Sequence, residues 1–152
     1  MRKSLVIVLV LTALGVGGWY LQSSGSSAGA TEITVYKTPW CGCCGNWVSH
    51  LRDNGFSVTV KEREDLDPIK RKHGVPENLG SCHTATVEGY TVEGHVPARE
   101  IQRMLAERPK ARGLAVPGMP TGSPGMESND PPDRYEVILF DDSGKGGVYA
   151  RY

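Results

Sequence analysis

The feature that most limits how this chain can fold is a strand-like segment that leads directly into a cluster of cysteines. Residues 32–36 alternate between polar and apolar side chains, as a half-buried β-strand does. After a turn, the chain reads Cys41-Gly42-Cys43-Cys44. Apolar side chains then recur at helical spacing: Trp47, Val48 and Leu51. Asn54-Gly55 is typical of a helix end, so the pattern predicts a strand, a cysteine turn and a helix that begins in the cysteine cluster.

Further strand and helix patterns follow along the chain. Strands are predicted at residues 56–60, 84–87, 90–93, 135–140 and 147–152, with the last two forming a C-terminal hairpin, and helices are predicted at residues 67–73 and 97–108. Asp67 is placed to cap the second helix, with Pro68 at its first helical position. Glu88-Gly89 has the length and the glycine of a hairpin turn. Residues 113–133 are rich in Gly, Pro and Met and are predicted to form a long loop, which in compact domains is usually functional or disordered.

The first 30 residues have the composition of an export signal. Arg2 and Lys3 precede an apolar run at residues 5–21, which is followed by a Ser- and Gly-rich tail ending in Ala28-Gly29-Ala30. The tail fits a signal-peptidase cleavage pattern, whereas the apolar run just reaches the lower limit for spanning a bilayer. Cleavage and retention as a membrane anchor with a Ser/Gly linker both stay open. Either fate places a single domain, residues 31–152, outside the cytoplasm and limits membrane contact to the N-terminal segment.

The balance of charge argues against one large class of partners, the nucleic acids. The chain has 152 residues, about one domain, with 17 Lys and Arg and 17 Asp and Glu. Because Arg2 and Lys3 lie in the N-terminal segment, the rest of the chain carries 15 basic and 17 acidic residues, a net charge of −2. Contacts to phosphates need clustered positive charge, so the composition disfavours a nucleic-acid partner.

Four cysteines carry most of the chemical information: Cys41, Cys43, Cys44 and Cys82. Two disulfides that staple a small exported domain are the common use of such a set. The three clustered thiols cannot each reach a distant partner, so at least one bond would be local, either between adjacent residues or across one helical turn. An adjacent bond between Cys43 and Cys44 would be strained because neighbouring Cα atoms are too close. The spacing of Cys41 and Cys44 at a helix start stabilises thiolate instead, which is typical of reactive or metal-binding cysteines.

The cysteine turn resembles the active-site turn of thioredoxin-like proteins, in which Trp-Cys-Gly-x-Cys joins a strand to a helix. In that layout the segment Ser81-Cys82-His83-Thr84 enters the hairpin beside the turn, so Cys82 is expected to face the other three cysteines. Cys43 departs from the thioredoxin pattern and argues against simple dithiol–disulfide exchange. Four converging sulfur donors suit Cu(I) or Zn(II), because thiolate is a preferred ligand of both ions.

Methionines and histidines extend the candidate site. Met119 and Met126 lie in the long loop, where their thioethers are either copper ligands or fillers of a gap in the core. His83 is either a metal ligand or a hydrogen-bond partner of one. His95 has either a structural role or closes the site from the hairpin, with Glu93 able to fix its tautomer. Three others are expected to be outside the site: Met104 as a core residue, and His50 and His73 as solvated or helix-terminal groups.

Four separate motifs together resemble the CopG-like proteins, a family of unknown function associated with bacterial copper resistance. They are Thr-Pro-x-Cys-x-Cys-Cys at residues 38–44, Ser-Cys-His-Thr-Ala at residues 81–85, Glu-Gly-His-Val-Pro-Ala at residues 93–98, and the Gly/Pro/Met-rich residues 113–126. The resemblance implies an α/β, thioredoxin-like periplasmic domain, with a mixed sheet and flanking helices, that binds a multinuclear Cu(I) cluster. By position the implied ligands are Cys41, Cys43, Cys44, Cys82, Met119, Met126 and His83.

Three functions therefore stay open. The leading hypothesis is an exported copper-binding protein that sequesters, transfers or changes the oxidation state of copper, with copper ions and other periplasmic copper-handling proteins as its partners. A copper-dependent oxidoreductase is one form of this hypothesis. The second is a periplasmic thiol–disulfide oxidoreductase that uses Cys41 and Cys44. The third is a structural zinc module that binds a partner protein.

Overall fold

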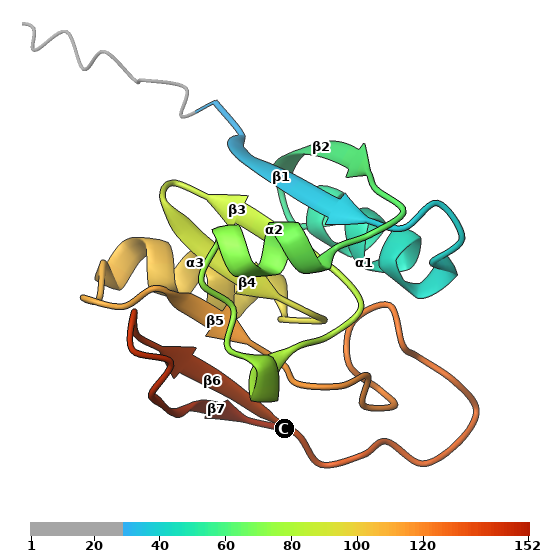
Figure 1. Cartoon of the computed structure of the whole chain (residues 1–152). Helices are drawn as coiled ribbons and strands as arrows, with labels where there is room; N and C mark the ends of the chain where they lie inside the picture. The colour runs from blue at the N-terminus through green and yellow to red at the C-terminus, as the bar shows by residue number, and fades with distance from the viewer. Residues whose placement is uncertain (1–28) are drawn as a thin grey trace, which may run out of the picture.

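The computed structural model describes residues 29–152, which form a seven-stranded mixed sheet in the order β2-β1-β3-β4-β5-β6-β7 (Figure 1). The strands are β1 (Thr31–Lys37), β2 (Phe56–Glu62), β3 (Thr84–Val87), β4 (Tyr90–Glu93), β5 (Gly113–Ala115), β6 (Glu136–Phe140) and β7 (Gly146–Arg151). The helices are α1 (Gly42–Asp53), α2 (Asp67–Lys72), η1 (Glu77–Leu79) and α3 (Ala98–Glu107). The mixed α/β fold is as predicted, whereas the likeness to thioredoxins stays a prediction.

The segment predicted to be a signal or anchor lies almost wholly outside the described residues. Within residues 29–152, no helix combines the length and the apolar character that crossing a membrane requires. The boundary between a targeting segment and a domain near residue 31 therefore stays a prediction.

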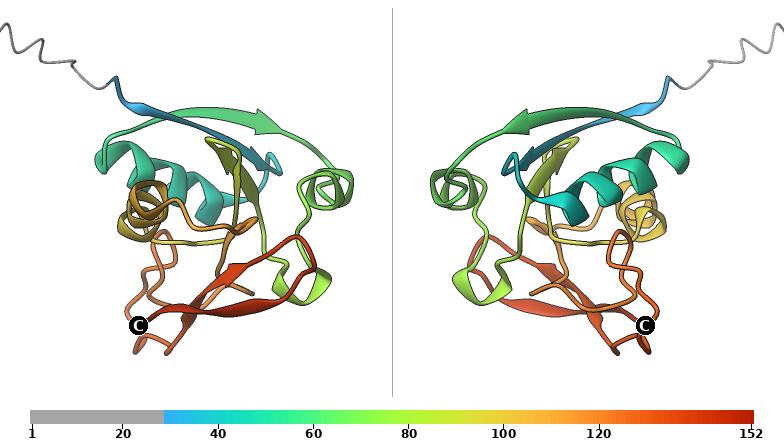
Figure 2. Two further views of the ribbon diagram at one scale, coloured as in Figure 1. Left: turned by 90° about the vertical axis from the view of Figure 1, so that its left-hand side faces the viewer. Right: turned by 90° about the vertical axis from the view of Figure 1, so that its right-hand side faces the viewer.

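The first part of the fold is a β1-α1-β2 unit. The two strands run parallel, with Thr31 opposite Phe56 and Lys37 opposite Glu62. Helix α1 covers one face of the sheet because its apolar side chains lie on one side; Trp47 and Leu51 are completely buried. Figure 2 shows α3 on the same face as α1 and α2 on the opposite face. The predicted strand, turn and helix are confirmed, and the turn brings the cysteines to the end of β1.

The hairpin of β3 and β4 continues the sheet beside β1. Glu88 and Gly89 both have positive φ, 45° and 89°, which is the conformation of a tight hairpin turn. Strand β3 pairs antiparallel with β1, and Thr84 lies opposite Glu93 within the hairpin. This register places the residue preceding β3 next to the residues that follow β4.

Two predictions about local structure are wrong. Asp67 does not cap α2: Leu66 occupies the cap position, and the Asp65 carboxylate accepts a hydrogen bond from the Asp67 backbone N–H at 2.9 Å. Residues 113–115 are not loop but β5, which pairs parallel with β4 and antiparallel with β6. The strand is too short to show a period, and it needs a glycine because a Cβ on Gly113 would lie 1.7 Å from the Thr91 carbonyl oxygen.

The rest of the long loop, which extends past its predicted end at residue 133 as far as residue 135, packs beside the cysteine turn. The Gly118 N–H donates to the Gly80 carbonyl at 3.3 Å, and its carbonyl accepts from the Ser81 hydroxyl. Gly125 packs directly on α1, because a Cβ there would lie 2.9 Å from the Cys43 carbonyl oxygen. The loop therefore lies beside the N-terminus of α1 and the segment that precedes β3.

Candidate metal centre

The cysteine turn presents three sulfur atoms at the N-terminus of α1. Cys41 is the N-cap residue, and its Sγ accepts the backbone N–H of Cys44 at 3.4 Å. Cys41 and Cys44 are joined by a disulfide, whereas Cys43 is free. The Sγ atoms of Cys41 and Cys43 are 3.5 Å apart. The turn thus holds one reducible pair and one free thiol in contact.

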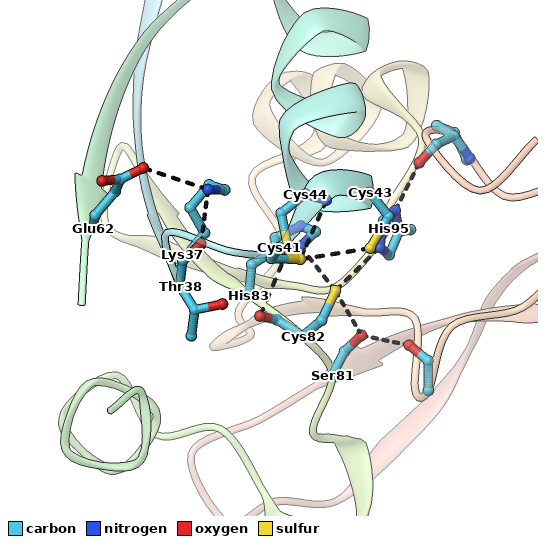
Figure 3. The surroundings of a disulfide bond; sticks show 12 residues. Lys37, Thr38, Cys41, Cys43, Cys44, Glu62, Ser81, Cys82, His83 and His95 are labelled. Atoms are coloured by element: carbon cyan, nitrogen blue, oxygen red, sulfur yellow. Dashed lines mark hydrogen bonds and ion pairs between the residues drawn. A yellow bond between two sulfur atoms is a disulfide. The ribbon is translucent and has the colours of Figure 1, made fainter. Parts of the chain in front are cut away.

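Cys82 lies against this turn from the other side. The four Sγ atoms of Cys41, Cys43, Cys44 and Cys82 all lie within 4.8 Å of one another. Figure 3 shows the Cys82 sulfur pointing toward the cysteine turn and toward His95. The expectation that Cys82 faces the other three cysteines is confirmed. These four residues, called the sulfur cluster below, form a group that could hold a metal.

Two histidines contact Cys82. His83 Nδ1 lies 3.3 Å from the Cys82 sulfur, and His95 Nε2 lies 3.1 Å from it. Both rings are completely buried, and their centroids are 4.9 Å apart in an edge-to-face arrangement. Cys82, His83 and His95 form a second group of potential ligands with its own convergence of donor atoms.

The sequence leaves two roles open for His95, a structural one and a place at the site. The hairpin register is the signal that decides its place: Thr84 lies opposite Glu93, and the Gly94 N–H donates to the His83 carbonyl at 3.0 Å. Two residues beyond the end of the pairing, Cys82 and His95 therefore meet. A sequence pattern gives this result only once the turn residues of the hairpin are fixed.

Glu93 does not fix the tautomer of His95, as the sequence suggested it could. The Pro124 carbonyl does so instead, accepting from His95 Nδ1 at 2.8 Å. The completely buried Glu93 carboxylate accepts from the Ser81 backbone N–H at 2.7 Å and from the Thr84 hydroxyl at 2.6 Å, and it pairs with the Lys70 ammonium. Glu93 therefore holds the residues on both sides of Cys82 and His83, Ser81 through its backbone and Thr84 through its hydroxyl.

Burial favours the neutral forms of Cys82, His83 and His95. Desolvation, followed by the neighbouring Cys43, raises the pKa of the Cys82 thiol to about 12. Desolvation also lowers the pKa of His95, and it lowers that of His83 well below the usual value, helped by His95 and by the Lys70 ammonium. A metal ion binding here must displace the thiol proton, and both imidazoles present lone pairs without losing a proton.

The methionines and remaining histidines lie as follows. The side chain of Met119 is 54% exposed, and Met126 is half-buried directly after Gly125, the glycine packed on α1. Met104 lies on α3 and is completely buried in the core, so its predicted core role is confirmed. His50 and His73 lie outside both groups of potential ligands. His50 is a neutral hydrogen-bond acceptor rather than a solvated charge, because its Nε2 accepts the Ala98 backbone N–H at 3.1 Å.

Comparison with solved structures shows to which proteins the chain is related. One structure, titled Copper resistance protein copG, Form 1, is 47% identical in sequence, with a TM-score of 0.77; the match covers 81% of this chain and 98% of that one. The chain belongs to the CopG family. Form 2 of the same protein is 48% identical with a TM-score of 0.76, covering 80% of this chain and 98% of that one. The family resemblance drawn from the sequence motifs is thereby confirmed.

A family model described as Protein of unknown function, DUF411, matches residues 79–126. No curated protein matches the chain. The matched segment contains Cys82, His83 and His95, together with Met119 and Met126. The family model therefore covers the Cys82–His83–His95 group and both loop methionines, but not the cysteine turn itself.

Proposed function

We propose that this CopG family member binds Cu(I) through the sulfur cluster and acts in copper resistance. The observation that carries the proposal is the convergence of four sulfur atoms within 4.8 Å, three from the start of α1 and one from the segment before β3. The family relationship supports copper as the metal, because the similar solved structures are named copper resistance proteins. Thiolate is a preferred ligand of Cu(I), so the four sulfur atoms fit the metal that the family relationship favours.

The copper-binding state requires reduction of the Cys41–Cys44 disulfide. Reduction supplies four thiols, of which three are crowded into one turn. Zinc prefers one closed tetrahedral site, whereas crowded thiolates bridge several Cu(I) ions. We therefore propose a multinuclear thiolate cluster, with His83, Met119 and Met126 as additional ligands. Met126 is favoured by its place directly after Gly125, which packs beside the Cys43 carbonyl.

The cellular role follows from the proposed export. An N-terminal signal or anchor at residues 1–30 would deliver residues 31–152 to the periplasm. There the protein would sequester copper, pass it to other periplasmic copper-handling proteins or change its oxidation state. The partly exposed side chains of Cys41, Cys43 and Cys82 give copper and a partner access to the cluster from solvent.

A thiol–disulfide oxidoreductase is the second candidate, favoured by one specific observation. The Cys41–Cys44 disulfide lies at a helix N-terminus, a position that stabilises the thiolate of a reactive pair. Catalysed insulin reduction separates the two functions. An oxidoreductase would retain its activity in Cys82→Ser, because Cys82 lies outside the pair.

The experiment that tests the copper proposal compares copper stoichiometry in serine variants of the reduced chain. Cys43→Ser and Cys82→Ser each remove a sulfur atom of the shared cluster, so the number of Cu(I) ions retained against a chelator should fall in both. Met104→Leu is the matched control for a buried sulfur outside the site and should retain the full number. Unchanged stoichiometry in both serine variants would exclude a shared cluster.

A further inference from the structure

We infer that Cys82, His83 and His95 form a second metal site, which holds a single divalent ion of borderline softness such as Zn(II). This inference goes beyond the copper proposal, because the site needs neither Cu(I) nor the thiols of Cys41 and Cys44. One sulfur and two imidazole nitrogens are a donor set that divalent first-row metals accept. All three residues lie within residues 82–95, at the open end of the β3–β4 hairpin.

The geometry is close to that of a bound ion. The Cys82 sulfur is 3.3 Å from His83 Nδ1 and 3.1 Å from His95 Nε2. A tetrahedral Zn(II) ion with ordinary Zn–S and Zn–N bonds holds sulfur and nitrogen about 3.6 Å apart. Each nitrogen therefore needs to move only a few tenths of an ångström away from the sulfur to admit the ion, and the two nitrogens lie within 4.8 Å of each other.

The tautomer of His95 is fixed for metal binding. Its Nδ1–H donates to the Pro124 carbonyl, which leaves the lone pair of Nε2 directed at the Cys82 sulfur. Metal-binding histidines commonly donate their second ring nitrogen to a backbone carbonyl or carboxylate, because that bond orients the ring. The long loop thus orients a residue of the hairpin toward Cys82.

A purely structural role for His83 would leave a buried polar atom unpaired, which costs free energy of folding. Its ring is completely buried against Trp47, with centroids 4.3 Å apart, and its Nε2 has no hydrogen-bond partner among the described residues. A buried polar atom without a partner costs free energy, whereas an apolar side chain would fill the same space without that cost. An imidazole at this position is explained if its other nitrogen, which faces Cys82, serves as a ligand.

The second site is available in the oxidised protein. The Cys41–Cys44 disulfide removes two donors from the sulfur cluster but leaves Cys82 as a free thiol. Three protein ligands leave a fourth position for water or an external ligand, as in metal sites that exchange ligands. The oxidation state of one disulfide would therefore decide whether the protein offers a four-sulfur cluster or a site with one sulfur and two nitrogens.

The test is an anaerobic titration of the full chain, with the Cys41–Cys44 disulfide intact, using Co(II) as the probe. We expect one Co(II) per chain, a thiolate-to-Co(II) charge-transfer band, and displacement of the ion by Zn(II). Cys82→Ser should abolish the band. His95→Gln should weaken Co(II) binding at least about tenfold, whereas His73→Gln, a matched change outside the site, should not. Zn(II) should also raise the Tm of the unsubstituted oxidised chain, which requires no variant.

Two results would overturn the inference. One is the absence of a charge-transfer band in the unsubstituted oxidised chain. The other is a band that survives His95→Gln but disappears in Cys43→Ser, since the ion would then bind a pair of sulfurs. Neither result bears on Cu(I) retention by the reduced chain, so failure of this site and failure of the copper proposal are distinguishable.

Discussion

Cys82 is the residue shared by the sulfur cluster and the Cys82–His83–His95 site. Its sulfur contacts two buried imidazoles, and its neighbours Ser81 and Thr84 are held by the Glu93 carboxylate. The cysteine turn was evident from the sequence because it lies in four consecutive positions. The contact of Cys82 with His95 could not be read directly, because it depends on the exact register of a hairpin.

A single glycine controls how closely the long loop approaches the cysteine turn. Gly125 has a φ of +84°, and a Cβ there would lie 2.6 Å from the Trp47 backbone nitrogen. Gly125→Ala should lower the free energy of unfolding by about 2 kcal/mol, because the new methyl group meets backbone and the conformation is strained. Urea denaturation measures the change, with Gly147→Ala as the control since nothing lies within 4 Å of that Cβ. Equal stability of the two variants would contradict the packing described.

His50 makes stability depend on pH. Desolvation lowers its pKa, and its Nε2 accepts the Ala98 N–H, a bond that protonation breaks. The folded state therefore binds fewer protons than the unfolded state, so the free energy of unfolding should fall as the pH drops below about 6.5. Denaturation between about pH 5 and about pH 8 should show a shallower slope in His50→Gln, which accepts the bond without titrating. A slope unchanged by the substitution would contradict this role.

A buried ion pair joins α2 to the β3–β4 hairpin. The Lys70 ammonium on α2 contacts the carboxylate of Glu93 on β4, which is inaccessible to solvent, and the Thr84 hydroxyl at 3.2 Å. These contacts tie the helix on one face of the sheet to the segment that carries Cys82. The pair therefore holds a ligand segment without contacting the metal itself.

The ion pair can be tested by a double-mutant cycle. Glu93→Leu leaves the Lys70 charge without its partner and should destabilise the fold by about 3 kcal/mol. Adding Lys70→Met removes the unpaired charge, so the double variant should be more stable than Glu93→Leu alone. Chemical denaturation of both single variants and the double variant measures the coupling. Strictly additive losses would show that the two groups act independently.

Sequence patterns predict some of the helices and strands and miss others. The strand and helix on either side of the cysteine turn, the hairpin and α3 were predicted because each has a clear period and a marked end. Strand β5 was missed because three residues carry no period, and its place in the sheet is set by the neighbours β4 and β6. The cap of α2 was placed one residue too far inside the helix because Asp65, rather than Asp67, supplies the carboxylate.

In the whole molecule, α1 and α3 lie on one face of the sheet and α2 lies on the other. The fold also brings segments that are distant in the sequence together. The start of α1, the segment before β3, the residues after β4 and the long loop all meet beside the end of β1 (Figure 1). Cys44 is buried, whereas the other three cysteines are partly exposed. The sulfur cluster is thus buried on the side of Cys44 and open to solvent at the other three cysteines, as the proposed exchange of copper would require.

In the proposed copper-binding state, the four thiols of the reduced protein surround several Cu(I) ions. The most direct measurement is an anaerobic Cu(I) titration of the reduced full chain, followed by a competing chelator, metal analysis and thiol counting. We predict that several copper ions are retained per chain and that all four thiols are protected. Retention of one ion or none, with Cys41 and Cys44 free to re-form their disulfide, would contradict the cluster and favour the oxidoreductase.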